Sequence, residues 1–187
     1  MSHTNEINEI LDDVSKQKCL VYSFGNRGNL QFEYGLREKI GKDTCEIHVF
    51  DDSEHFNSYE SLPGLDDGTV FFHPWSLEGS EKQSSARNLL TMQETVEALG
   101  HTHMVIDIFK IDCDGCEWDI YKDLFDAEVT IMQILVEVHG SPPNANDFFE
   151  TLQKHHYVTF HKEPNTLFSG GTCQKYSFLK LAPEFFS

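Results

Sequence analysis

Glycines and acidic side chains stand at the ends of three apolar runs in this sequence. Gly25 and Gly28 close the first run, Asp51 follows the second, and Asp112 ends a later one. A glycine turn that leads into a helix leaves backbone N–H groups open to a polar ligand. A carboxylate at a strand end can accept hydrogen bonds from both hydroxyls of a ribose. These residue types predict a pocket for a nucleotide-like molecule, with a tight turn and a solvated strand end as the alternatives.

A second kind of chemistry comes from Glu137 and His139, because either side chain can accept a proton. Glu137 lies within the apolar run Ile131–Val138, and His139 follows it. A carboxylate is costly to bury there unless it is paired or functional. An imidazole titrates near neutral pH and suits a general base, although a strand-end histidine can also simply bond a backbone carbonyl. We therefore take Glu137 and His139 as candidate catalytic residues. Asp112, the carboxylate at the end of the preceding apolar run, is the third candidate.

The cysteines allow a competing hypothesis. Cys113 and Cys116 form a C-x-x-C pair with acidic neighbours, and such a pair can bind zinc or cycle between thiols and a disulfide. No second pair stands at zinc-finger spacing, so we expect no metal ligands. The chain has five cysteines, an odd number, and three of them lie in strand-like runs. We therefore expect buried thiols rather than a disulfide framework.

Length and charge limit the class of protein and of partner. The chain has 187 residues, which fits one domain, and we divide it into a tail with a short helix over 1–18 and a single domain over 19–187. A formal net charge of −17 disfavours nucleic acid and favours a small-molecule partner. No apolar run approaches the roughly 18 residues of a membrane span. No oligomeric state is indicated.

The N-terminus is polar, with neither a basic region nor an apolar signal core. We therefore expect a soluble, cytoplasmic protein, with the lumenal form of a membrane-anchored parent as the alternative.

Strand and helix patterns alternate along the chain. Phe32, Leu36 and Ile40 recur at helical spacing after the first glycine turn, and Thr91–Glu94 is a capping box for a helix over 92–99. No long helix separates the last two strand patterns, so these should pair antiparallel. The sequence predicts a three-layer, doubly wound α/β fold with a seven-stranded, mostly parallel sheet and a C-terminal antiparallel hairpin. The predicted strands are 19–24, 45–50, 69–73, 104–111, 131–138, 157–161 and 175–180.

An ordered series of segments from Cys19 to Leu181 resembles the FkbM-like branch of the class I S-adenosylmethionine-dependent methyltransferases, and most closely the methyltransferase-like protein 24 type of domain. The segments are Val21–Gly25, Val49–Asp51, Phe72–Trp75, Phe109–Asp112, Ile134–His139 and Phe160–Asn165. The chain departs from the pattern Asp-x-Glu-Gly, because Asp114 stands where the glutamate is common.

The resemblance implies an enzyme that uses S-adenosyl-L-methionine to methylate a hydroxyl of a small molecule or sugar. It implies that Gly25, Asn26 and Gly28 hold the methionine part of this cofactor, and that Asp51 binds its ribose. Trp75 and Ser76 fall where adenine is read, and Asp112 falls near the sulfur, with Glu137 and His139 beside it. The alternatives are a noncatalytic Rossmann-like binding module and the metal or thiol site at Cys113 and Cys116.

Overall fold

The computed structural model describes residues 18–52, 68–82, 88–166 and 172–186. The short helix expected near the N-terminus lies outside the described residues, so the proposed division at residue 18 stays a prediction. Nothing in the described ranges forms a helix long and apolar enough to cross a membrane.

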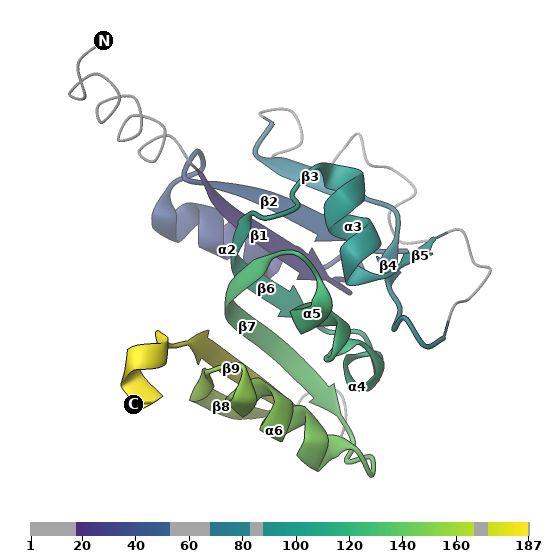
Figure 1. The fold of residues 1–187 in the computed structure, drawn as a ribbon. Coiled ribbons are helices and arrows are strands. Elements are labelled where there is room, and N and C mark those ends of the chain that lie inside the picture. The colour runs from purple at the N-terminus through teal and green to yellow at the C-terminus, as the bar shows by residue number, and fades with distance from the viewer. Residues whose placement is uncertain (1–17, 53–67, 83–87, 167–171, 187) are drawn as a thin grey trace.

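A seven-stranded sheet forms the centre of the molecule, in the order β3-β2-β1-β6-β7-β9-β8 (Figure 1). All neighbouring strands run parallel except β9, which is antiparallel to both β7 and β8. The predicted mostly parallel sheet with a terminal hairpin is therefore confirmed. The strands are β1 (Cys19–Phe24), β2 (Cys45–Phe50), β3 (Val70–His73), β6 (Val105–Ile111), β7 (Thr130–His139), β8 (Tyr157–Asn165) and β9 (Cys173–Lys180).

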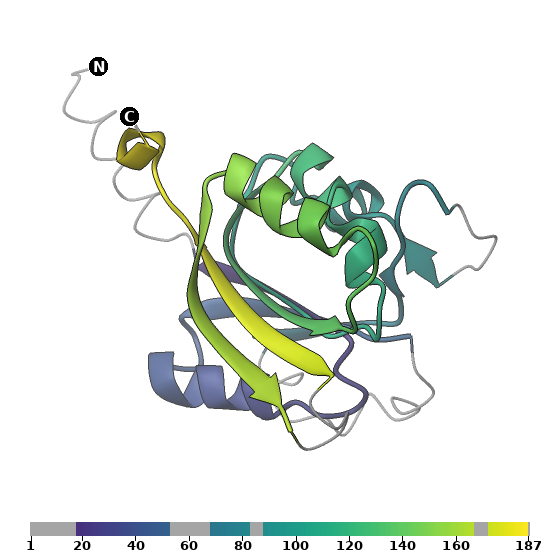
Figure 2. The same cartoon turned by 90° about the horizontal axis from the view of Figure 1, so that it is seen from below.

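Helices cover both faces of this sheet, which makes three layers (Figures 1 and 2). Helix α2 (Gln31–Ile40) packs on one face, over β1 and β2. The capping box at Thr91 is present, and Gly100 ends the next helix in the left-handed conformation. The helices of the opposite face are α3 (Met92–Leu99), α4 (Glu117–Ile120), α5 (Asp123–Asp126) and α6 (Ala145–Lys154), and a 3-10 turn, Pro183–Phe186, follows the sheet.

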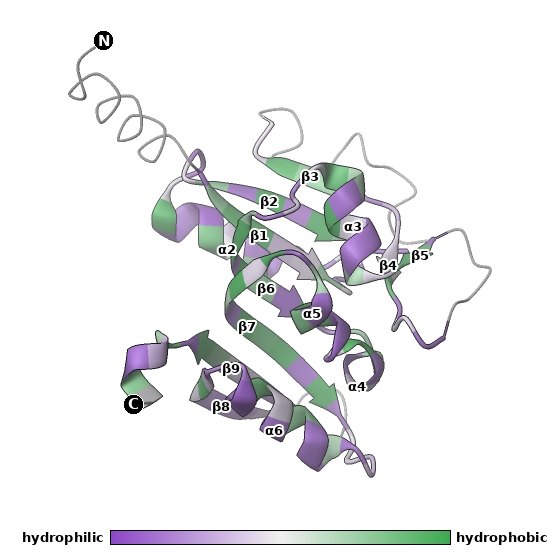
Figure 3. Ribbon diagram, viewed as in Figure 1, coloured by the Kyte–Doolittle hydropathy of each residue, from purple (hydrophilic) through white to green (hydrophobic). Residues whose placement is uncertain are grey.

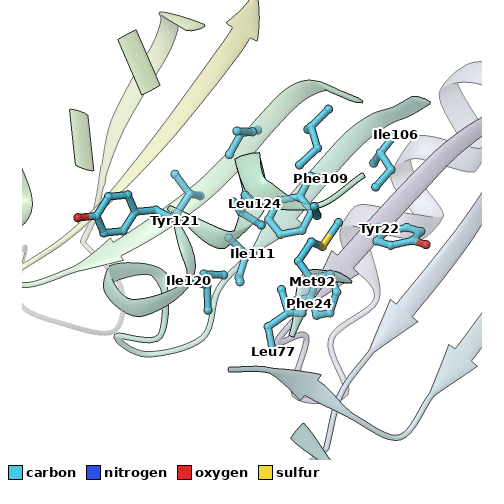
Figure 4. Packing of buried hydrophobic residues seen from close by; sticks show 14 of the residues in the cluster. Tyr22, Phe24, Leu77, Met92, Ile106, Phe109, Ile111, Ile120, Tyr121 and Leu124 are labelled. Carbon is cyan, nitrogen blue, oxygen red and sulfur yellow. The ribbon is translucent and has the colours of Figure 1, made fainter. Parts of the chain in front are cut away.

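Two hydrophobic cores lie on the two faces of the sheet, because alternate side chains of each strand point to opposite sides. Strands β1 and β7 of the sheet interior are mostly apolar in Figure 3, whereas the edge strand β8 is largely polar. The larger core contains Tyr22, Phe24 and Phe109 of the central strands with Met92 of α3 (Figure 4). Phe24 also stacks on Phe50 with ring centroids 4.1 Å apart, which joins β1 to β2.

Two details differ from the predictions. Ile40 completes the helical spacing of α2 but is 40% exposed, because the end of that helix extends past the core that Phe32 and Leu36 contact. A small parallel pair of strands, β4 (Ser76–Leu77) and β5 (Leu89–Leu90), stands where no strand was expected. Pairs this short have too few residues to show a recognisable pattern.

The expectation of buried thiols is wrong for four of the five cysteines. Disulfides join Cys19 to Cys45 and Cys113 to Cys116, and Cys173 is free and buried. Cys19 and Cys45 begin neighbouring parallel strands in register, with Cα atoms 4.4 Å apart. Such a pairing depends on sheet register, which cysteine count and spacing do not reveal. The second disulfide also leaves no free thiolate in the C-x-x-C pair as a zinc ligand in this structure.

At Gly25 the backbone that follows β1 comes close to the backbone at the end of β6. It has φ of +75°, and a Cβ atom built on it would stand 1.8 Å from the carbonyl oxygen of Asp112. Any side chain at this position would push the two strand ends apart. The glycine is thus required by packing within the chain, whatever ligand approaches it.

Replacing Gly25 with alanine should lower the free energy of unfolding by roughly 2–4 kcal/mol, or prevent folding, because both the contact and the φ angle are violated. Gly35 is the matched control, since it lies within α2 with nothing within 4 Å of the position of its Cβ. Gly35→Ala should stabilise by roughly 0.5–1 kcal/mol. Urea unfolding of both variants measures this, and equal stability of the two would contradict the packing described.

Candidate functional site

The carboxyl ends of four parallel strands lie at one level. The register pairs Phe24 with both Phe50 and Ile111, and Ile111 with Val136. The next residue of each strand therefore stands at the same edge of the sheet, in the spatial order Asp51, Gly25, Asp112 and Glu137. In doubly wound sheets this edge is where ligands bind. The residues with candidate chemistry are thus gathered along one line of the molecule.

The loop after β1 has an unusual backbone. Gly25, Arg27 and Gly28 all have positive φ, at +75°, +47° and +80°. Arg27 forms an ion pair with Asp114 of the loop after β6, and both side chains are largely exposed. The amide of Gly25 donates to the carbonyl of Phe50, so the loop is attached to β2 as well. The turn is therefore held on both sides by neighbouring strand ends.

The side chain of Asn26 points into the protein, where it holds this loop in place. Its Nδ2 donates to Glu33 Oε1 at 3.0 Å, and its Oδ1 accepts from Lys110 Nζ at 2.8 Å. Glu33 is fully buried on α2 and also accepts the hydroxyl of Ser23 at 2.5 Å. These bonds occupy the amide of Asn26, so the structure gives that side chain a role in fixing the loop.

Burial lowers the pKa of Lys110, and the carboxylates of Glu33, Asp112 and Glu137 oppose that shift. The ammonium group is thus the positive centre among several acidic side chains. Breaking such a buried, charge-assisted network would leave its members unsatisfied, which costs more than each bond contributes by itself.

Asp51 is only 3% exposed although it is charged and stands at a strand end. Its backbone N–H donates to His73, which joins the ends of β2 and β3. Trp75 lies just beyond β3 and packs on Phe50 and His73, with ring centroids 5.7 and 4.7 Å away. Ser76 is the first residue of β4 and pairs with Leu89. Trp75 therefore lies next to the ends of β2 and β3, and Ser76 follows it in the short strand β4.

His139 is surrounded by three carboxylates. Its Nδ1 lies 3.1 Å from Glu117 Oε1, and its Nε2 lies 3.6 Å from Asp112 and 3.4 Å from Asp114. Since a carboxylate only accepts, a hydrogen on either ring nitrogen would have an acidic partner, Glu117 at Nδ1 and the two aspartates at Nε2. The backbone N–H of His139 also donates to Glu117, at 2.6 Å. The ring is therefore held in its orientation by acidic residues at both of its nitrogens.

A groove with a volume of about 420 Å³ opens beside these strand ends, on the face of the sheet that carries α2. Four of the predicted site residues line it: Gly25, Asn26, Asp112 and Glu137. The groove lining does not include the others, which are Gly28, Asp51, Trp75, Ser76 and His139. His139 is connected to the groove through Asp112, while Glu137 is held by Asn165, whose Nδ2 lies 2.6 Å from Glu137 Oε1.

Three residues of the site were not assigned a role from the sequence. Glu33 and Lys110 fasten the first loop, and Glu117 fastens the second by accepting from Gly115 N at 2.9 Å as well as from His139. The sequence could have indicated the role of Glu33, because this residue lies beside the apolar positions of α2, where a buried charge needs a partner. Glu117 gives a similar signal, because the next residue is the buried Trp118.

Glu117→Gln should lower the free energy of unfolding by roughly 1–3 kcal/mol. The carboxylate contacts the backbone N–H groups of Gly115 and His139 and the His139 ring, and a neutral amide would form weaker hydrogen bonds with them. Glu38→Gln on the exposed side of α2 is the control and should have no measurable effect. Urea unfolding followed by circular dichroism compares them. If the two variants match, Glu117 does not hold the loop and the strand end together.

Comparison with known proteins agrees with this architecture. Residues 5–180 match the family model described as a methyltransferase domain. A structure described as a ribosomal RNA methyltransferase from Plasmodium falciparum is similar with a TM-score of 0.51 and 13% identity, over 96% of each chain. One described as an rRNA methylase from Clostridium thermocellum has a TM-score of 0.50 and 10% identity, over 94% of this chain and 96% of the other.

The CurJ carbon methyltransferase has a TM-score of 0.52 and 8% identity, over 92% of this chain and 52% of that protein. These structures share the fold of this chain. The methyl acceptors that their descriptions mention are different, namely carbon in one and ribosomal RNA in the others. No curated protein sequence matches the chain. The family model spans nearly the whole sequence, and so the chain belongs to the methyltransferase domain family, whose members are S-adenosylmethionine-dependent methyltransferases.

Proposed function

We propose that this methyltransferase binds S-adenosyl-L-methionine along the edge formed by β2, β1 and β6, and transfers its methyl group to a hydroxyl of a small molecule or sugar. The proposal rests on the register of the three strands. Asp51, Gly25 and Asp112 each directly follow a residue that is paired with its neighbour in the sheet, so they stand side by side. A single extended ligand can contact all three positions from one side.

The residues at this edge suit the parts of the cofactor. Asp51 would accept both ribose hydroxyls, and the turn from Gly25 to Gly28 would lie along the methionine part. Trp75 and Ser76 would border adenine, and Asp112 would stand near the positive sulfur. Asn26 acts as a positioning residue here, because its amide is bound to Glu33 and Lys110. A buried carboxylate at the end of β2 fits a ligand that brings its own hydrogen-bond donors.

The proposed proton acceptor is His139. Bound S-adenosylmethionine supplies an electrophilic methyl group, so the chain has to orient the acceptor hydroxyl and take up its proton. If His139 donates its Nδ1–H to Glu117, Nε2 of the neutral ring would receive the proton of the acceptor. Asp112, 3.6 Å from Nε2, would then stabilise the imidazolium. Glu137 stands at the same edge and would contact the acceptor in the groove.

The groove favours a polar small molecule as the acceptor. Side chains of both charges line it, among them Lys175 and Glu163 with the phenol of Tyr176. A small polar molecule can match such a mixture at short range. A nucleic acid presents a long run of phosphates, which the net charge of −17 would repel. The rRNA acceptors in the names of similar structures make RNA the second acceptor class to test.

Asp51→Asn should raise the dissociation constant for S-adenosylhomocysteine at least about tenfold, because each hydrogen bond to a charged group is worth roughly 1.5–3 kcal/mol. Asp52→Asn is the control, since Asp52 is adjacent but exposed, and it should bind like the parent. Isothermal titration calorimetry measures both. Equal affinities would remove Asp51 from the cofactor site, and no heat with the parent would favour a noncatalytic binding module.

His139→Gln should lower kcat by roughly 10²–10⁴-fold while leaving S-adenosylhomocysteine binding unchanged, as expected for loss of a general base. The measurement is transfer of radiolabelled methyl groups to a panel of sugars and phenols, with total RNA as a further acceptor. Labelling of RNA alone would contradict the proposed acceptor class. Unchanged turnover in the variant would contradict the role of His139.

A further inference from the structure

A second group of polar side chains lies between β2 and the turn after α3. Glu46 and His48 lie two residues apart on β2, and His101 follows the C-terminal Gly100 of α3. Their ligand atoms, one carboxylate oxygen and two imidazole nitrogens, all lie within 4.8 Å of one another. Glu46 stands near the start of β2, whereas Asp51 stands at its other end. The two groups are connected through His73, whose ring bonds His48 and packs on Trp75.

Hydrogen bonds orient both imidazole rings toward Glu46. His48 Nδ1 lies 2.7 Å from His73 Nε2, and His101 Nδ1 lies 2.7 Å from the hydroxyl of Tyr22. The opposite nitrogens face Glu46 Oε1, His48 Nε2 at 2.8 Å and His101 Nε2 at 3.9 Å. In metal sites a ligating histidine is oriented by a partner on its other nitrogen in this way.

The histidines of this group are suited to donate lone pairs. His48 is almost fully buried, and the Nδ1 atom of each ring already has a hydrogen-bond partner, which leaves the Nε2 atoms facing Glu46. Among the described residues, the ion-pair partners found for Glu46 are these two histidines. A divalent cation between the three groups would give this carboxylate a fixed positive partner.

We propose that Glu46, His48 and His101 bind a divalent transition-metal ion, with zinc as the best match. Two imidazoles and one carboxylate are ligands that suit zinc far better than magnesium or calcium. Bonds of about 2.0–2.2 Å in a tetrahedral arrangement place ligand atoms about 3.3 Å apart. The observed 2.8 and 3.9 Å bracket that spacing, so small side-chain movements suffice. The rings stay neutral if the His48 proton moves to Nδ1, where His73 Nε2 accepts it.

The metal would tie β2 to the turn after α3, which are far apart in the sequence. Glu46 is 37% exposed in its side chain, so the ion can enter from solvent and a water molecule can complete its coordination. A ligand that binds only the folded state raises stability in proportion to the logarithm of its concentration. Its test measures metal binding directly and needs neither methyl transfer nor S-adenosylmethionine.

The test uses the untagged, chelator-treated full chain and zinc chloride. The parent should bind one equivalent of zinc in calorimetry and show a rising melting temperature. Glu46→Gln and His101→Asn should each weaken that affinity at least about tenfold. His103→Asn is the matched control, because this nearby histidine is 77% exposed, and it should bind zinc like the parent. Absence of binding by the parent, or equal binding in all variants, would overturn the proposal.

X-ray absorption of the zinc-loaded parent provides a test that needs no variant to fold. Two imidazole nitrogens with oxygen ligands are expected, at about 2.0–2.2 Å. Sulfur at about 2.3 Å would place the ion on cysteines such as Cys113 and Cys116. An all-oxygen shell, or one imidazole with oxygens, would place it among carboxylates such as Asp112 and Asp114. Either spectrum would overturn the assignment.

Discussion

The contact between the end of β1 and the end of β6 is the constraint on which the site depends. Asp112 N donates to the carbonyl of Phe24 at 3.2 Å, and the missing side chain of Gly25 lets the two backbones meet. A parallel sheet needs helical or loop crossovers, which return each strand to the same starting edge. All the carboxyl ends then collect at the other edge. The candidate chemistry of the chain is therefore a consequence of topology and of one close backbone approach.

Two buried carboxylates hold the loops at this edge of the sheet in fixed positions. Glu33 reaches from α2 to the loop after β1, and Glu117 reaches from α4 to the loop after β6 and to His139. Each accepts several hydrogen bonds, which offsets the cost of burying its charge. Some of the acidic residues of the chain are thus buried and hold its loops, and do not only lie on its surface. Rigid support of this kind is what a reaction governed by alignment requires.

Much of the fold follows from local patterns. Short apolar runs bounded by glycine or acidic residues predicted the seven strands, and the capping box at Thr91 predicted the start of α3. The pairing of Cys19 with Cys45 and the inward turn of Asn26 could not be predicted, because each depends on partners distant in the sequence. The same is true of the group around His48, whose members come from separate elements.

The placement of the candidate residues in the chain was easier to predict than their contacts. Asp51 and Asp112 stand where a strand ends, and the end of a strand is visible in the sequence. The partners of His139 are visible only in part, since Asp112 and Asp114 come from the loop after β6 and Glu117 from α4. Side-chain networks are decided by packing between elements, which periodicity does not describe.

The most direct test of the account is a crystal structure of this chain with S-adenosylhomocysteine bound. The account predicts the ribose against the carboxylate of Asp51, the amino-acid part along Gly25–Gly28, and the sulfur nearer to Asp112 than to β3. A ligand bound away from the carboxyl ends of β2, β1 and β6 would contradict it, as would a ribose that contacts another carboxylate.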